Sequence, residues 1–259
     1  MTYKSIIFLV LFATLFSCTA QKAKEEMPPM AKNVILLIGD GTGLSQISSA
    51  FYFKKTRPNY ARFKHIGLIN TSSSREDITD SAAGATAFAS GIKTYNGAVG
   101  IADDSTKVKN LVEMVSLQNI KTGVISTSSI QHATPASFYA HVINRGLYED
   151  IASDMVVSNI DFFAGGGAKF FNKRADGKNL LENLEANGFG INTTALGAFE
   201  EINQYSKMGY LLAENHLDPV AEGRGDFLPK ATELGIKFLN KDANNPNFFL
   251  MVEGSQIDW

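Results

Sequence analysis

The sequence predicts an α/β fold with a central, mostly parallel sheet flanked by helices. Short apolar runs typical of buried strands alternate with helical patterns along most of the chain. The length of 259 residues, of which 44% are hydrophobic and 19% charged, suits one large domain with a sizeable core. Ligands of such sheets bind at the carboxyl ends of the strands, where we expect the functional residues to lie.

The first 31 residues are expected to precede this domain. Residues 1–18 look like an export signal, because Lys4 is followed by an apolar stretch that is short for a membrane span. Cys18, the only cysteine, follows Leu-Phe-Ser, as in bacterial lipoprotein signals whose cysteine is acylated. An ordinary cleaved signal is the alternative. Residues 19–31 are predicted to be a polar linker, and the protein is expected in the periplasm or outer membrane, lipid-anchored through Cys18.

The domain is expected to begin at residue 32 with a strand. Residues 33–39 are continuously apolar and end in GDGTG, the pattern of a strand buried on both faces, and a helix is expected from about Leu44. Further strands are predicted at residues 65–70, 121–126, 161–164, 209–212 and 247–252. The clearest further helices are predicted at residues 111–118, 148–157, 180–186 and 228–239.

Asp40 lies just after the first predicted strand, between two glycines that let a ligand or metal approach the backbone. A G-x-G-x-x-G dinucleotide motif would need a further glycine at position 44 or 46, and no G-x-x-x-x-G-K-[ST] is present. Both nucleotide interpretations are therefore weak. The structural alternative is that Asp40 only caps the following helix.

Ser81 belongs to a run of small residues, TDSAAGATAFASG at 79–91, which predicts a tightly packed helix with Ser81 in its first turn and Gly91 at its end. The positive end of a helix favours an anion beside the serine hydroxyl. The alternative is that Ser81 is an N-cap. No G-x-S-x-G surrounds it, so a nucleophile elbow is not supported and a metal is expected to activate it.

The segment HATP at 132–135 predicts a helix start, with Pro135 at the first helical position. Arg145 follows, and its guanidinium is shaped to hold two oxygens of a tetrahedral anion. The alternative is a surface salt bridge, which arginines form more often. His141 is expected to be packed or structurally bonded. Glu253 and Asp258 follow the last predicted strand, where their oxygens suit magnesium or zinc unless they form an acidic loop.

The overall charge excludes one class of partner. The chain has 24 basic and 26 acidic residues, a formal net charge of -2, and no basic stripe. Nucleic acid is therefore not expected as a specific partner. A phosphate site must instead be built locally.

Together these motifs resemble the alkaline phosphatase family across nearly all of residues 32–259. The segments that carry the resemblance are NVILLIGDG (33–41), TDSAAGATA (79–87), KTYNGAVG (93–100), HATP (132–135) and MVEGSQID (251–258). The resemblance implies the alkaline-phosphatase-like α/β sandwich and metal-dependent hydrolysis of phosphate monoesters through a phosphoserine. It also implies two Zn²⁺ and one Mg²⁺ per site and a homodimer.

The resemblance assigns roles to single residues. Ser81 would be phosphorylated, and Arg145 would hold the phosphate oxygens. The implied metal ligands are Asp40 between one zinc and magnesium, Thr134 and Glu253 on magnesium, and Asp258 on the other zinc. His132 and Trp259 resemble the animal and certain marine bacterial enzymes, whereas the enterobacterial type has Asp and Lys there.

The chain departs from the family pattern after Asp258, where the family has four further ligand residues: a histidine, an aspartate–histidine pair and another histidine. The histidines present, His65, His132, His141 and His216, match none of these motifs. We therefore expect the C-terminal part of the fold to be missing, each zinc to lack most of its ligands, and these 259 residues to be inactive in isolation.

Two other classes of function remain open. A related enzyme acting on phosphodiesters or sulfate esters would also use a two-metal active site. The C/S-x-P-x-R motif of sulfatases is absent around Ser81. A non-catalytic surface lipoprotein that retains the fold is the second alternative. Covalent phosphorylation of Ser81 distinguishes an enzyme from such a lipoprotein.

Overall fold

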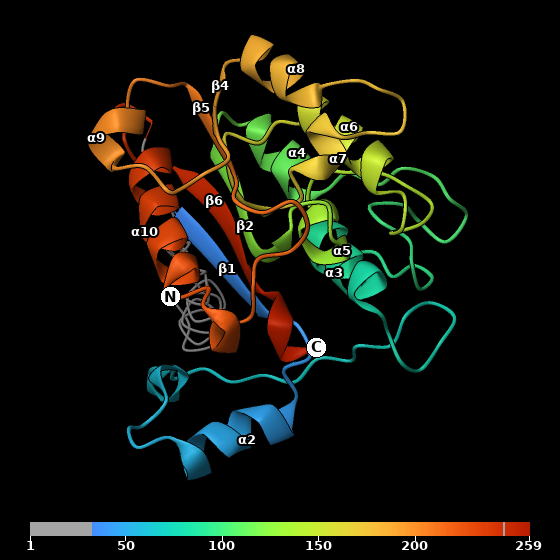
Figure 1. Ribbon diagram of the computed structural model, residues 1–259. Helices are drawn as coiled ribbons and strands as arrows, with labels where there is room; N and C mark the ends of the chain where they lie inside the picture. The colour runs from blue at the N-terminus through green and yellow to red at the C-terminus, as the bar shows by residue number, and fades with distance from the viewer. Residues whose placement is uncertain (1–32, 246) are drawn as a thin grey trace, which may run out of the picture. The chain divides into compact units, whose positions relative to one another are not determined.

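A six-stranded sheet forms the centre of the computed structural model, which describes residues 33–245 and 247–259 (Figure 1). The strands are β1 (Asn33–Gly39), β2 (Lys121–Ser129), β3 (Phe162–Gly166), β4 (Phe189–Asn192), β5 (Lys207–Leu211) and β6 (Phe248–Gly254). They lie in the order β1-β6-β2-β3-β5-β4, and every neighbouring pair is parallel. The predicted parallel α/β sheet is therefore confirmed, while the signal and linker predicted for residues 1–31 lie outside the described residues.

Helices cover both faces of this sheet (Figure 1). The α-helices are α2 (Leu44–Phe53), α3 (Ser81–Ser90), α4 (Leu111–Ser116), α5 (Ala133–Ala136), α6 (Tyr148–Val157), α7 (Lys169–Asn172), α8 (Leu180–Ala186), α9 (Phe199–Ile202) and α10 (Phe227–Leu239). Short 3-10 helices follow as η1 (Asn59–Arg62), η2 (Val220–Glu222) and η3 (Ser255–Ile257). None of the described helices is long and apolar enough to cross a membrane.

Side chains of the central strands alternate between two hydrophobic clusters. Phe162 and Leu250 belong to the cluster that α10 covers, whereas Phe163 and Met251 pack on the other face with α4, α6 and α8. This alternation follows from the two-residue period of a strand. Because both faces are covered, β3 begins with Phe-Phe-Ala and β6 with Phe-Phe-Leu-Met-Val, and such apolar runs made these strands recognisable in the sequence.

The first strand has the predicted bounds but not the predicted burial. Val34 is 47% and Leu37 62% exposed, so the expectation of a strand buried on both faces is wrong. Within the described part of the chain, β1 pairs only with β6 and is an edge strand. A continuous apolar run indicates a strand, but its position within the sheet depends on partners elsewhere in the sequence.

The strand predicted at residues 65–70 is absent, whereas β4 was not predicted. Ile66 and Leu68 are 91% and 89% exposed, and no described strand pairs with their segment. A strand exists only where a neighbour accepts and donates its hydrogen bonds, so an apolar pattern is not sufficient. β4 is short and contains Gly190, which weakens its sequence signal.

Candidate active site

Two parallel strands deliver carboxylates to the same edge of the sheet. Gly39 at the end of β1 is in register with Gly254 at the end of β6, and the Asp40 amide donates a hydrogen bond to the Gly254 carbonyl at 3.2 Å. Asp40 therefore lies beside the segment that carries Glu253 and Asp258. Ser81, at the start of α3, meets this edge from a distant part of the sequence.

Ser81 is positioned by a hydrogen bond and not used as a helix cap. Its hydroxyl donates to Asp40 Oδ2 at 2.7 Å, while Asp80 is the N-cap of α3 and accepts from the Ala83 amide at 2.9 Å. The alternative of a Ser81 N-cap is thus wrong, because its neighbour takes that role. Gly91 ends the helix with φ 72°, as predicted.

Burial is the main cause that raises the pKa of Asp40 above its ordinary value, and the charge of Asp258 adds to this rise. The Ser81 hydrogen bond and the positive charge of Arg145 act in the opposite direction. Asp40 does not cap α2, whose N-cap residue is Gly43, so the capping alternative is not supported. The repulsion between the Asp40 and Asp258 carboxylates is a kind of arrangement that a bound cation stabilises.

Gly41 allows Asp258 to approach Asp40. Its φ is +73°, and a Cβ added there would lie 2.6 Å from the Asp258 Cα. Only glycine combines this backbone conformation with so close an approach. The glycine-rich turn thus brings the exposed Asp258, which follows η3, against the end of β1.

Glu253 is completely buried in the central strand β6. Its Oε2 accepts hydrogen bonds from the hydroxyls of Ser126 at 2.5 Å and Ser255 at 2.7 Å. Its Oε1 has no hydrogen-bond partner among the described residues, and burial raises the pKa of this carboxyl. The hydroxyls of Ser126, Ser255 and Thr134 act against this rise in the pKa.

This unused oxygen is the observation that tests whether the residues fit a metal. Buried carboxylate oxygens without partners are rare, and Mg²⁺ prefers oxygen ligands such as carboxylates and hydroxyls. Glu253, Thr134 and Asp40 therefore fit a magnesium ion. Among the described residues, however, no three or more His, Cys, Asp or Glu side chains are grouped so that they could hold a metal ion by themselves.

Arg145 is held beside α3 by Asp80, a residue that the sequence reasoning did not single out. Its Nη1 donates to Asp80 Oδ2 at 2.9 Å, and the same oxygen accepts from the Gly97 amide at 3.0 Å. The pair is only about a quarter exposed. The salt bridge considered as an alternative thus exists, and it holds the guanidinium near the start of the helix that carries Ser81.

His132 lies between Arg145 and Trp259. Its Nε2 is 3.1 Å from Arg145 Nη2, and its ring centroid is 5.8 Å from that of Trp259. Burial, followed by the charge of Arg145, lowers the pKa of His132 to about 4, so the ring is neutral at neutral pH. His216 was not predicted to belong to the site, but its ring centroid lies 4.8 Å from that of Trp259, so the rings of His132, His216 and Trp259 form one aromatic group.

The helix predicted at HATP begins at Ala133, so Pro135 is its third and not its first residue. This position is still in the first turn, where a missing N–H breaks no intrahelical bond. His141 is structurally bonded as expected: its Nε2 lies 3.1 Å from Glu113 Oε1 and its Nδ1 2.5 Å from the Gly100 carbonyl.

Asp80→Ala is expected to lower the free energy of unfolding by about 2 kcal/mol, because it removes both the helix cap and the Arg145 ion pair. Asp80→Asn keeps a side chain that can cap the Ala83 amide and should lose about half as much or less. Urea unfolding of both variants measures the difference. Equal losses would show that the charge of Asp80, and not its capping bond, stabilises this region.

The family model described as alkaline phosphatase matches residues 31–259. Alkaline phosphatase 3 of Bacillus subtilis is 35% identical over 98% of this chain and 58% of its own length. The alkaline phosphatase structure from the Antarctic bacterium TAB5 is 63% identical, with a TM-score of 0.86 over 88% of this chain and 66% of that one.

A further solved structure bears on metal binding in such proteins. It is a TAB5 alkaline phosphatase in which a histidine is replaced by aspartate, with magnesium bound in its M3 site, and it has 64% identity and a TM-score of 0.86. This chain spans about three fifths of the first curated relative and 66% of the TAB5 enzyme. The sequence motifs, the parallel sheet and these matches agree that the chain belongs to the alkaline phosphatase family.

Proposed function

We propose that this chain carries the nucleophile, the phosphate-binding arginine and the magnesium ligands of an enzyme that hydrolyses phosphate monoesters. The observation that carries the proposal is the 2.7 Å hydrogen bond from the Ser81 hydroxyl to Asp40, at the start of a helix beside Arg145. Because the chain spans only 58% of the first curated relative, the activity is proposed for a completed chain. The 259 residues alone are proposed to be inactive.

The chain's own residues divide the chemistry between them. Ser81 Oγ forms a bond to phosphorus while the bond to the leaving alcohol breaks, and water later cleaves the phosphoserine. Arg145 and the first amides of α3 hold the phosphoryl oxygens in place. Asp40, Thr134 and Glu253 would hold magnesium, and Asp40 and Asp258 would contribute to zinc sites. Bound metal ions supply positive charge that polarises the serine hydroxyl and offsets the charge of the phosphoryl group.

The proposal is tested by completing the chain. The hybrid joins residues 1–259 to the segment of the TAB5 enzyme that follows the residue aligned with Trp259. With zinc and magnesium, we expect this completed chain to hydrolyse nitrophenyl phosphate and the 259-residue chain to show no turnover. Preference for bis-nitrophenyl phosphate would indicate a phosphodiesterase. Absence of both activities in a folded hybrid would favour a non-catalytic protein.

His132 and Trp259 are proposed to make phosphate binding weaker than in enzymes with Asp and Lys at these places. His132 is neutral at neutral pH, so neither side chain adds a charge beside Arg145. In the completed chain, the double variant His132→Asp and Trp259→Lys should lower the inhibition constant for inorganic phosphate about tenfold, which corresponds to one added charge-assisted hydrogen bond. An unchanged inhibition constant would refute this role.

Export and lipid anchoring through Cys18 are proposed from the signal-like sequence, which lies outside the described residues. In bacterial cells that make the full chain, the protein should fractionate with membranes, and Cys18→Ala should release it.

A homodimer is proposed for the completed chain from its family. Sedimentation of the hybrid as a monomer would refute the dimer.

A further inference from the structure

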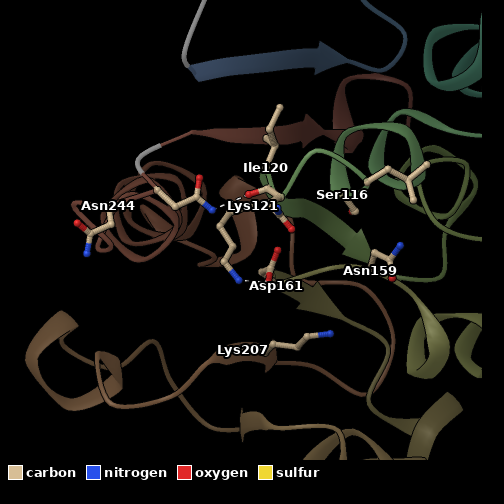
Figure 2. Close-up of a pocket in the computed structure, with 10 residues that line it drawn as sticks. Ser116, Ile120, Lys121, Asn159, Asp161, Lys207 and Asn244 are labelled. Atoms are coloured by element: carbon tan, nitrogen blue, oxygen red, sulfur yellow. Dashed lines mark hydrogen bonds and ion pairs between the residues drawn. The ribbon is translucent and has the colours of Figure 1, made fainter.

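A cavity of about 710 Å³ lies at the edge of the sheet opposite the candidate active site (Figure 2). Lys121 begins β2, Lys207 begins β5 and Asp161 immediately precedes β3, so all three lie at the amino ends of parallel strands. Ser81 and Asp40 lie at the carboxyl ends. A ligand in this cavity would therefore be separate from the phosphatase site.

The cavity has an uncompensated positive charge. Asp161 is fully engaged, because it accepts from Lys121 Nζ at 2.9 Å and from the Thr122 amide at 2.9 Å. Lys207 has no ion-pair partner among the described residues, and its ammonium lies 5.1 Å from the Phe189 ring centroid. In Figure 2 the Lys207 side chain points away from the Lys121–Asp161 pair. One ammonium is thus available to an anion.

Burial, and then the positive charge of Lys121, lower the pKa of Lys207 although Asp161 opposes the shift. Lys241, near the same pair, has a lowered pKa for the same two causes, and its ammonium donates to the carbonyls of Asn203 and Tyr205. Lys121 therefore lies close enough to Lys207 and Lys241 for its charge to lower the pKa of both. An anion would offset the mutual repulsion of these lysines.

Uncommitted amides complete the lining. Asn119 and Asn159, both exposed to solvent, line the cavity, and no hydrogen bond within the described residues uses their side-chain amides. An amide both donates and accepts, which matches hydroxyl groups as well as anionic oxygens. The volume lies in the range of small-molecule sites and exceeds what a bare ion would fill.

We propose that this cavity binds a small polyhydroxylated anion of the sugar-phosphate class, with its phosphate on Lys207 and its hydroxyls on the asparagine amides. The ammonium binds the charged phosphate, and the amides can both donate hydrogen bonds to the hydroxyls and accept hydrogen bonds from them. The inference does not depend on the proposed phosphatase activity, because the two sites share no residue.

Calorimetric titration of the 259-residue chain with glucose 6-phosphate tests the proposal, in an Arg145→Met background that weakens phosphate binding beside Ser81. Glucose 6-phosphate should bind at least tenfold more tightly than glucose or inorganic phosphate. Lys207→Gln should weaken this binding about tenfold or more, whereas Lys207→Arg should retain most of it. Lys230→Gln, an exposed lysine on α10, is the matched control and should change nothing.

A second measurement is independent of whether the variants fold. In the unmutated chain, the side-chain amide NMR signals of Asn119 and Asn159 should shift on titration with glucose 6-phosphate. Unmoved signals, or affinity unaffected by Lys207→Gln, would overturn the proposal. Equal affinity for inorganic phosphate would overturn the part assigned to the hydroxyls.

Discussion

Replacing Ser81 with alanine in the completed chain is expected to lower kcat for phosphate monoesters by about 10⁴-fold or more, because it removes the atom that bonds to phosphorus. The same change removes the hydrogen bond to Asp40 Oδ2. This bond lies at a partly exposed edge, so its loss should change the free energy of unfolding by only about 1 kcal/mol. Steady-state hydrolysis and urea unfolding, measured on the same preparation, separate the two effects.

Ser90→Ala is the matched control for this loss. Ser90 ends the same helix, and its hydroxyl donates to the Thr86 carbonyl at 2.7 Å, away from Asp40. We expect this variant to keep kcat within about twofold, since a partly exposed hydrogen bond of this kind affects stability and not chemistry. A loss in Ser90→Ala as large as that in Ser81→Ala would show that α3 is merely sensitive to substitution.

Glu253→Gln is expected to abolish the stabilisation of the chain by magnesium. At a magnesium concentration of 100 times Kd, binding to the native state contributes about 2.7 kcal/mol, which raises Tm by about 5–10 °C for a domain of this size. The amide keeps the shape of Glu253 but lacks the charge of its unbonded Oε1. Thermal unfolding with and without magnesium measures the difference, and Glu233→Gln on α10 is an exposed control.

Without magnesium, Glu253→Gln should make the native state more stable than that of the unmodified chain. Burial raises the pKa of Glu253, so the folded chain must either keep this proton or bury a charge. As pH rises above the ordinary glutamate pKa of 4.5, the unfolded state ionises first and the native state loses stability until the folded-state pKa is reached. At pH 7, metal-free Glu253→Gln should therefore unfold at a higher temperature than the unmodified chain. Equal magnesium responses in both proteins would contradict the assigned site.

Much of the site was predictable because its residues follow local signals. The glycines after the first strand, the small residues of 79–91 and the acidic end of the last strand each indicate a strand end or helix start. In a parallel sheet such positions converge, which is why Asp40, Ser81 and Glu253 meet at one edge. Helices α6 and α8 have the predicted bounds because their apolar periodicity is local.

The remaining features depend on contacts between distant residues. Ser126 on β2 binds Glu253 across 127 positions of sequence, and Asp80 reaches Arg145 across 65. Hydrophobic periodicity predicts helices and strands, but a single serine or aspartate gives no sequence pattern from which such a long-range contact could be predicted. The exposed edge of β1 and the missing strand at 65–70 have the same cause, since pairing partners determine both.

The most direct test of the account is the identity of the phosphorylated residue. The completed chain is quenched with acid during turnover of a phosphate monoester, digested, and analysed by mass spectrometry. We predict one phosphoryl group on the peptide that contains Ser81, absent from Ser81→Ala. Phosphate on another residue, or continued turnover without any covalent phosphoenzyme, would contradict the assignment of Ser81 as the nucleophile.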